Sequence, residues 1–85
     1  MITVRCLGHI GTSVGAKELT VPGGDIEASE LVDKVRAAAR ERDPGFTKFN
    51  TLVMVEDGEA FVAAGASRVL KDGAKVVLIP FSHGG

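Results

Sequence analysis

The last two residues of the sequence, Gly84 and Gly85, are the ones whose type and position could take part in chemistry. A carboxylate behind two residues without side chains has no bulk beside it, so it can enter a narrow channel where another enzyme attacks it. Ser82 and His83 precede the glycines and would be recognised with them. The alternative is an ordinary frayed chain end, because terminal glycines bury nothing and keep great conformational freedom. The terminal pattern alone leaves both interpretations open.

This terminal segment follows Val76–Ile79, the most apolar run in the chain. Such a run is typical of a strand in the centre of a sheet. We therefore expect one folded domain over residues 1–79 and a mobile tail over residues 80–85. Ordering six tail residues would cost roughly 6–12 kcal/mol, which only a partner could offset. Fully extended, the tail would project about 20 Å.

Composition narrows the classes of function. The 85 residues suffice for one domain, and a net charge of −1 offers no basic face for direct nucleic-acid binding. One cysteine cannot form an internal disulfide or a metal cluster, which is typical of a reducing cytoplasm. No apolar run approaches the ~18 residues that a membrane span needs. We expect a small soluble cytoplasmic protein that is monomeric when free.

The first part of the chain predicts a hairpin. Residues Met1–Leu7 alternate, which indicates a half-buried strand with Leu7 on its outer face. Gly8–Gly15 is punctuated by glycines and is interpreted as a long turn region. Lys17–Val21 alternates again, so we expect it to pair antiparallel with the first strand. The inward side chains of the first strand are Ile2, Val4 and Cys6.

A helix is expected next. Asp25 is a plausible N-cap and Ser29 competes with it, while Asp43–Gly45 should end the helix. Between these limits the apolar residues fall at helical spacing and the charged residues cover the opposite face. The predicted inward face consists of Ala28, Leu31, Val32, Val35, Ala38 and Ala39.

The rest of the chain predicts three strands. Leu52–Val55 is a strong strand, Asp57–Gly58 supplies a tight turn, and Glu59–Ala63 returns as a weaker strand. Ala64–Leu70 is interpreted as irregular, and Lys75–Ile79 is the last strand. One helix must then cover one face of the sheet, with the first and last strands as its central pair. The order predicts an α+β fold of the β-grasp type, a mixed sheet of about five strands clasping one main helix.

At this point the sequence resembles the ubiquitin-like sulfur carriers. The similarity is carried by Val53–Glu59, by Leu70–Pro80 and by the Gly84–Gly85 end, and it follows the element order over essentially the whole chain. The family includes the small subunit of molybdopterin synthase, the thiamine-pathway sulfur carrier, the ubiquitin-related modifier and the small archaeal modifier proteins. Together, these features favour a functional tail.

The resemblance implies a protein substrate and not an enzyme, with no catalytic residue and no bound cofactor of its own. An ATP-dependent enzyme of the ubiquitin-activating type would adenylate Gly85, and sulfur would then replace the adenylate to give a thiocarboxylate. The product would pass sulfur to an acceptor enzyme, as in tRNA thiolation, or be joined to lysines of target proteins. An alternative in the same family is the molybdopterin synthase subunit of molybdenum cofactor biosynthesis. An alternative of another class is a passive β-grasp interaction module.

A partner should bind beside the tail. Leu7, Phe61 and Phe81 cannot all fit in a core covered by one helix, so we expect them to form an exposed apolar surface that an activating enzyme or acceptor contacts. The alternative is that Phe61 joins Phe46 and Phe49 in closing the open end of the core.

The remaining candidates for chemistry are weaker. Cys6 is expected to be a small buried core residue. His9 and His83 lack a third ligand and make a poor zinc site, so we expect no metal.

Overall fold

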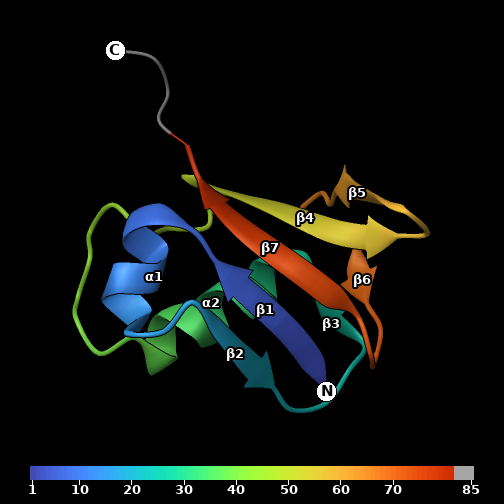
Figure 1. The fold of residues 1–85 in the computed structure, drawn as a ribbon, viewed down its shortest axis with the longest axis horizontal. Helices are drawn as coiled ribbons and strands as arrows, with labels where there is room; N and C mark the ends of the chain where they lie inside the picture. The colour runs from blue at the N-terminus through green and yellow to red at the C-terminus, as the bar shows by residue number, and fades with distance from the viewer. Residues whose placement is uncertain (82–85) are drawn as a thin grey trace.

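The computed structural model describes residues 1–81 of the chain. Within them, five strands form one mixed sheet in the order β2-β1-β7-β4-β5, and two short strands, β3 and β6, form a second sheet (Figure 1). No helix in this part of the chain has the length and apolar character needed to cross a membrane. The elements in chain order are β1 (Ile2–Cys6), α1 (Gly8–Val14), β2 (Glu18–Val21), β3 (Ile26–Glu27), α2 (Ala28–Ala38), β4 (Thr51–Asp57), β5 (Ala60–Ala63), β6 (Val69–Leu70) and β7 (Lys75–Pro80).

The strand β7 lies at the centre of the five-stranded sheet. It pairs parallel with β1 and antiparallel with β4, so both of its edges are hydrogen-bonded. The first and last strands are therefore the central pair, as the sequence predicts. The antiparallel hairpin of β1 and β2 is also confirmed, with Ile2 opposite Val21 and Arg5 opposite Glu18.

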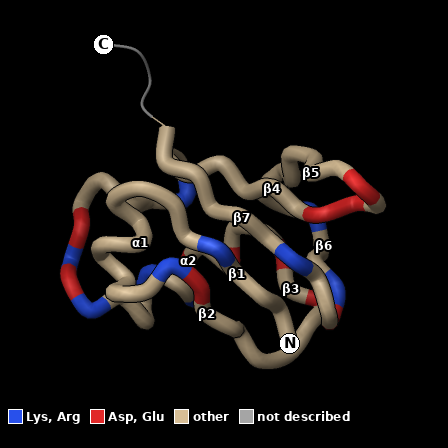
Figure 2. Tube along the Cα trace, in the orientation of Figure 1, with Lys and Arg blue, Asp and Glu red and all other residues tan. Residues whose placement is uncertain are grey.

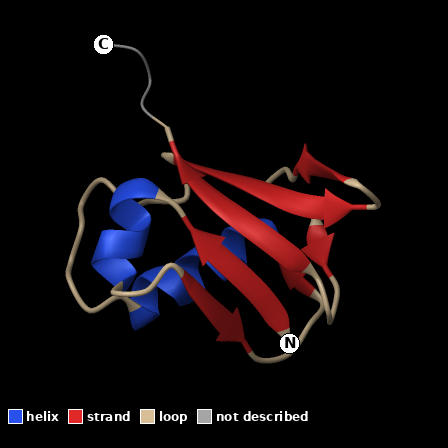
Figure 3. Ribbon diagram, in the orientation of Figure 1, coloured by secondary structure: helices blue, strands red, loops and turns tan. Residues whose placement is uncertain are grey.

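Both helices lie on the same face of the sheet, and the opposite face carries no helix (Figure 3). The predicted inward face of α2 is confirmed at four positions, Ala28, Leu31, Val32 and Val35, which are all buried. Burying a side chain such as Leu31 contributes roughly 1.5–3 kcal/mol. The result is the two-layer β-grasp architecture expected from the sequence, with α2 as its main helix.

The segment Gly8–Gly15, expected as a turn region, contains the helix α1, so that prediction is wrong. Ile10 and Val14 lie one helical turn apart and are both buried in the core. Gly11 allows the helix to approach the end of β1, because a Cβ built there would lie 2.9 Å from the carbonyl oxygen of Cys6. The glycine at position 11 therefore marks the close packing of a short helix and not a turn.

The predicted limits of α2 are also wrong at both ends. Asp25 is no N-cap but adopts a left-handed conformation with φ of 54°, and the helix begins only at Ala28. The helix starts later than expected because Ile26–Glu27 forms a strand that pairs with β6. The strand β6 lies in Ala64–Leu70, the segment that the sequence predicts as irregular. The helix ends at Ala38 because Ala39 is extended, well before the proline expected to stop it. Ala38 itself is exposed.

Replacement of Gly24 should test the packing of the loop that precedes β3. A Cβ built at Gly24 would lie 2.5 Å from the backbone nitrogen of Asp72, and a backbone atom cannot move aside alone. We expect Gly24→Ala to lower the free energy of unfolding by about 1–3 kcal/mol in urea denaturation. Gly65→Ala is the matched control, because a Cβ there would meet nothing within 4 Å. Equal stability of the two variants would contradict this close approach.

Candidate functional site

The candidate site lies at the carboxyl end of β7, the last strand that the structure describes before the end of the sequence. The strand extends through Pro80, one residue further than expected, and the N–H of Phe81 donates a 3.0 Å hydrogen bond to the carbonyl oxygen of Asn50. The residues predicted for recognition and activation, Ser82, His83, Gly84 and Gly85, lie outside the described residues.

An apolar surface covers the helix-free face of the sheet beside this end. Val53 and Leu78 are buried and opposite each other. Because side chains alternate along a strand, their neighbours Leu52 and Ile79, also opposite each other, point to the other face. Leu7 joins them, because it is extended and follows Cys6, which is buried and paired with Leu78, so its side chain also points to the other face. We call this surface the outer patch; its residues are Leu7, Leu52, Met54, Val77 and Ile79.

The three predicted partner residues are all accessible: Leu7 is 39% exposed, Phe61 47% and Phe81 41%. Leu7 belongs to the outer patch and Phe81 directly follows β7. Phe61 lies apart from them on β5, which is separated from β1 by two strands of the sheet. The structure therefore brings Leu7 to the end of β7 but does not gather the three residues into one compact surface. Their role in partner binding stays a prediction.

The alternative that phenylalanines close the core holds for one of the three. Phe46 is buried, whereas Phe49 and Phe61 are exposed. Sequence reasoning missed four members of the outer patch, namely Leu52, Met54, Val77 and Ile79. The signal that could have found them is the alternation within two continuous apolar runs, which places every second side chain on the uncovered face.

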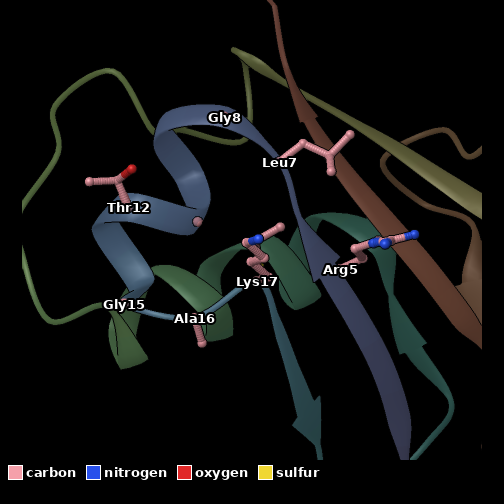
Figure 4. A pocket seen from close by; sticks show the side chains of 9 residues that line it. Arg5, Leu7, Gly8, Thr12, Gly15, Ala16 and Lys17 are labelled. Atoms are coloured by element: carbon pink, nitrogen blue, oxygen red, sulfur yellow. The ribbon is translucent and has the colours of Figure 1, made fainter.

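An open hollow of about 630 Å³ adjoins the outer patch at Leu7 (Figure 4). Arg5 and Lys17 line it and no acidic residue does, so the hollow is positively charged. Its other lining residues are Cys6, Leu7, Gly8, Gly11, Thr12, Gly15 and Ala16. Beside an apolar surface, such a hollow suits an acidic side chain of a docked protein.

Cys6 faces the core, as the sequence predicts. It is buried, and burial raises the pKa of its thiol to about 11. At neutral pH the thiol is therefore protonated and is a poor nucleophile. Within residues 1–81, no group of three or more histidine, cysteine, aspartate or glutamate side chains is placed to hold a metal ion.

A clasp joins α1 to the loop that follows α2. The Nδ1 atom of His9 lies 2.6 Å from Oδ2 of Asp43, and the Ser13 hydroxyl donates a 2.6 Å hydrogen bond to the carbonyl oxygen of Glu41. The hydrogen bond from His9, and then that from the backbone N–H of Gly45, lower the pKa of the Asp43 carboxyl. The clasp orders the loop on the helix side of the sheet, away from the outer patch.

The hydrogen bond between His9 and Asp43 predicts that the stability of the protein falls at acid pH. Because the pKa of Asp43 is lowered in the fold, its ionised form stabilises the protein above the ordinary pKa of an aspartate, and this contribution is lost as the pH falls through the lowered value. His9→Ala should move the pKa of Asp43 up toward its ordinary value, as measured by NMR titration of the carboxyl carbon. Thr12→Ala, an exposed change on the same helix, is the control. An unchanged pKa in His9→Ala would show that His9 is not the cause.

Comparison by sequence finds no matching family model and no matching curated protein. Comparison by structure finds full-length matches. The crystal structure of SAMP1 from Haloferax volcanii has a TM-score of 0.67 at 19% identity, covering 99% of this chain and 98% of that one. A second H. volcanii structure, of small archaeal modifier protein 1, gives 0.68 at 17% identity with 95% and 97% coverage.

A third match is to a chain of the Amycolatopsis orientalis BexX/CysO complex, with a TM-score of 0.59 and 19% identity. It covers 100% of this chain and 100% of the matched chain. At these identities the likeness concerns the fold. Small archaeal modifier proteins are among the proteins that the sequence resembles, so the resemblance is confirmed at this level. The chain has the ubiquitin-like β-grasp fold, which it shares with small archaeal modifier protein 1 and with the BexX/CysO structure.

Proposed function

We propose that this protein is a ubiquitin-like carrier or modifier that is activated at the carboxylate of Gly85 by an ATP-dependent partner enzyme. The observation that carries the proposal is the end of β7, where the central strand of a β-grasp fold ends beside a partly exposed apolar patch, five residues before the end of a sequence that closes with two glycines. One of the similar structures is a complex with a second protein, BexX, which supports docking of such a fold on a partner.

The chemistry needs no side chain of this protein. A carboxylate is a poor electrophile, so the partner first joins it to the α-phosphate of ATP, with pyrophosphate as leaving group. A sulfur donor at the oxidation level of hydrosulfide then attacks the carbonyl carbon, and AMP leaves. The resulting thiocarboxylate is a good nucleophile for sulfur transfer, whereas attack of a lysine amine on the activated carboxyl would give a conjugate instead. ATP would be bound by the partner and not by this chain.

The outer patch is the surface on which the partner would dock. It is apolar, it is uncovered by helices, and it lies at the end of the sheet from which Pro80 and Phe81 lead away. A few well-packed residues near the centre of an interface supply most of its binding free energy, and an apolar surface free of helices lets a partner pack against it in this way. The positively charged hollow beside Leu7 would then add selectivity for an acidic partner surface.

Intact mass spectrometry of the protein isolated from its native cells tests the proposal. Exchange of one oxygen for sulfur raises the mass by about 16 Da, and fragmentation should place the change on Gly85. A conjugate linked from Gly85 to a lysine would equally support an activated carboxyl end. A protein with only the unmodified mass, which no activating enzyme adenylates in the presence of ATP, would contradict the proposal.

A further inference from the structure

The strand β5 ends the five-stranded sheet on one side, and its outer edge is exposed. Within residues 1–81, β5 pairs with β4 alone. Ala63 is paired with Met54, so the next pair in the same register is Ala64 with Val53. The Ala64 N–H donates a hydrogen bond to the carbonyl oxygen of Val53, which makes this a hydrogen-bonded pair. Because hydrogen-bonded pairs alternate along an antiparallel ladder, Val62 also faces β4. The backbone groups of Phe61 and Ala63 therefore point away from the sheet.

This edge lacks the features that usually prevent strand pairing. Charged side chains, proline and bulges block edge strands in most proteins. The opposite edge, β2, follows this rule, since it begins with Glu18 and is followed directly by Pro22. In contrast, Ala60–Ala63 contains neither charge nor proline, and its phenylalanine is 47% exposed. Of the two edges, β5 is the one whose residues include no charge or proline to hinder the pairing of another strand.

The turn beside this edge is negatively charged. Glu56, Asp57 and Glu59 flank Gly58 at the tip of the β4–β5 hairpin, which is red in Figure 2. Within the described part of the chain, none of these three carboxylates lies within ion-pair distance of a basic group. A strand added to β5 with a basic residue at this end would supply the missing charge.

We propose that the β5 edge binds an extended peptide segment of a partner protein that carries a basic residue beside an apolar one. The segment pairs through its backbone with Phe61 and Ala63, which extends the sheet by one strand. Its apolar side chain lies opposite Phe61 on the face of the outer patch, and its basic side chain reaches the acidic turn. This site is separate from the chemistry proposed at Gly85.

A second copy of the chain fits this edge less well. In an antiparallel pair of two β5 edges, the turn of one copy meets the segment beyond Ala63 of the other, which begins with the uncharged residues Ala64, Gly65 and Ala66. Arg68, the first charged residue of this segment, does not continue the edge, because its carbonyl oxygen accepts a hydrogen bond from Ala28 at the start of α2. The acidic turns would stay unmatched. The charges therefore favour a basic peptide over self-pairing, and sedimentation of the full chain alone distinguishes the two. A dimer that Ala63→Pro dissociates would overturn the choice of occupant.

A synthetic peptide of sequence Lys-Val-Thr-Val-Thr-Val tests the site by NMR titration of the full-length protein. We expect the amide signals of Phe61 and Ala63 to shift. N-methylation of the peptide amides on the side that faces β5 should weaken binding at least about tenfold, while methylation of the alternate amides should not. Replacing the lysine with glutamate should also weaken binding, by about fivefold or more.

Variants of the protein complete the test. Ala63→Pro removes an outward N–H, and edge strands tolerate proline, so it should abolish binding without unfolding the domain. Ala63→Ser keeps the N–H and should bind normally. Equal binding by both variants, or equal binding of the two methylated peptides, would overturn the proposal. Activation at Gly85 should proceed in Ala63→Pro, so a failure here leaves the proposed function unaffected.

Discussion

Removal of Gly85 should abolish ATP-dependent activation completely while leaving the free energy of unfolding within about 0.5 kcal/mol of the full-length value. Every helix and strand that the structure describes lies within residues 1–81, and we expect the fold not to depend on Gly85. Activation can be measured as pyrophosphate exchange with a candidate activating enzyme, and stability by urea denaturation.

A second variant, Gly84→Trp, tests the need for small residues at the chain end, because it keeps the length of the chain and its terminal carboxylate. If a narrow channel admits the chain end, the bulky side chain should also weaken activation, without a change in stability. Activation that persists after removal of Gly85 would contradict the proposed carrier function and would favour a passive interaction module. A loss of several kcal/mol in stability would show that Gly85 supports the fold.

Leu52→Arg should reduce activation by at least about tenfold, because it places a charge on the outer patch beside Ile79. Leu52 is on β4 opposite Ile79, and it is partly exposed on the helix-free face. Loss of a contact on which an interface depends costs about 2 kcal/mol or more, which corresponds to about thirtyfold in affinity. The measurement is the concentration of carrier that gives half-maximal pyrophosphate exchange.

The matched control is Thr20→Arg, the same new side chain on β2. Thr20 is opposite Thr3 in the hairpin and is exposed, and β2 is the far edge strand, away from the outer patch. It should activate normally, and both variants should keep native stability within about 1 kcal/mol. Equal activation of the two variants would show that the partner docks elsewhere.

Sequence alone predicts most of the sheet because its signals are local. Alternation identifies β1 and β2, and the continuous run from Val76 to Ile79 identifies the central strand. The Asp57–Gly58 turn identifies the β4–β5 hairpin, and helical spacing identifies the inward face of α2. These features together suffice for the β-grasp architecture.

The helix α1 could not be predicted because its stability comes from tertiary packing. Gly8 and Gly11 lie within it, and glycine lowers helix propensity by about 1 kcal/mol per residue relative to alanine. Burial of Ile10 and Val14 against the sheet offsets this cost. The two-residue strand β3 has the same origin, because Ile26 pairs with Leu70 more than forty positions later.

The candidate site was predicted only in part. Leu7 could be assigned to the outer face because its strand alternates with polar residues. Leu52 and Ile79 lie in apolar runs, where the residue types do not say which side is covered. That decision requires knowing that both helices lie on one face. The acidic turn is visible in the sequence, but the exposed edge beside it follows only from the strand order.

The parallel pairing of β1 with β7 also decides how the molecule responds to mechanical load. Both strands begin at the same end of the sheet, so a pull between Met1 and Phe81 draws them in opposite directions along their length. The hydrogen bonds between them are then strained in shear and resist together, instead of opening one after another from one end. An unfolding enzyme that pulls on the chain beyond Phe81 would meet its greatest resistance at the centre of the sheet.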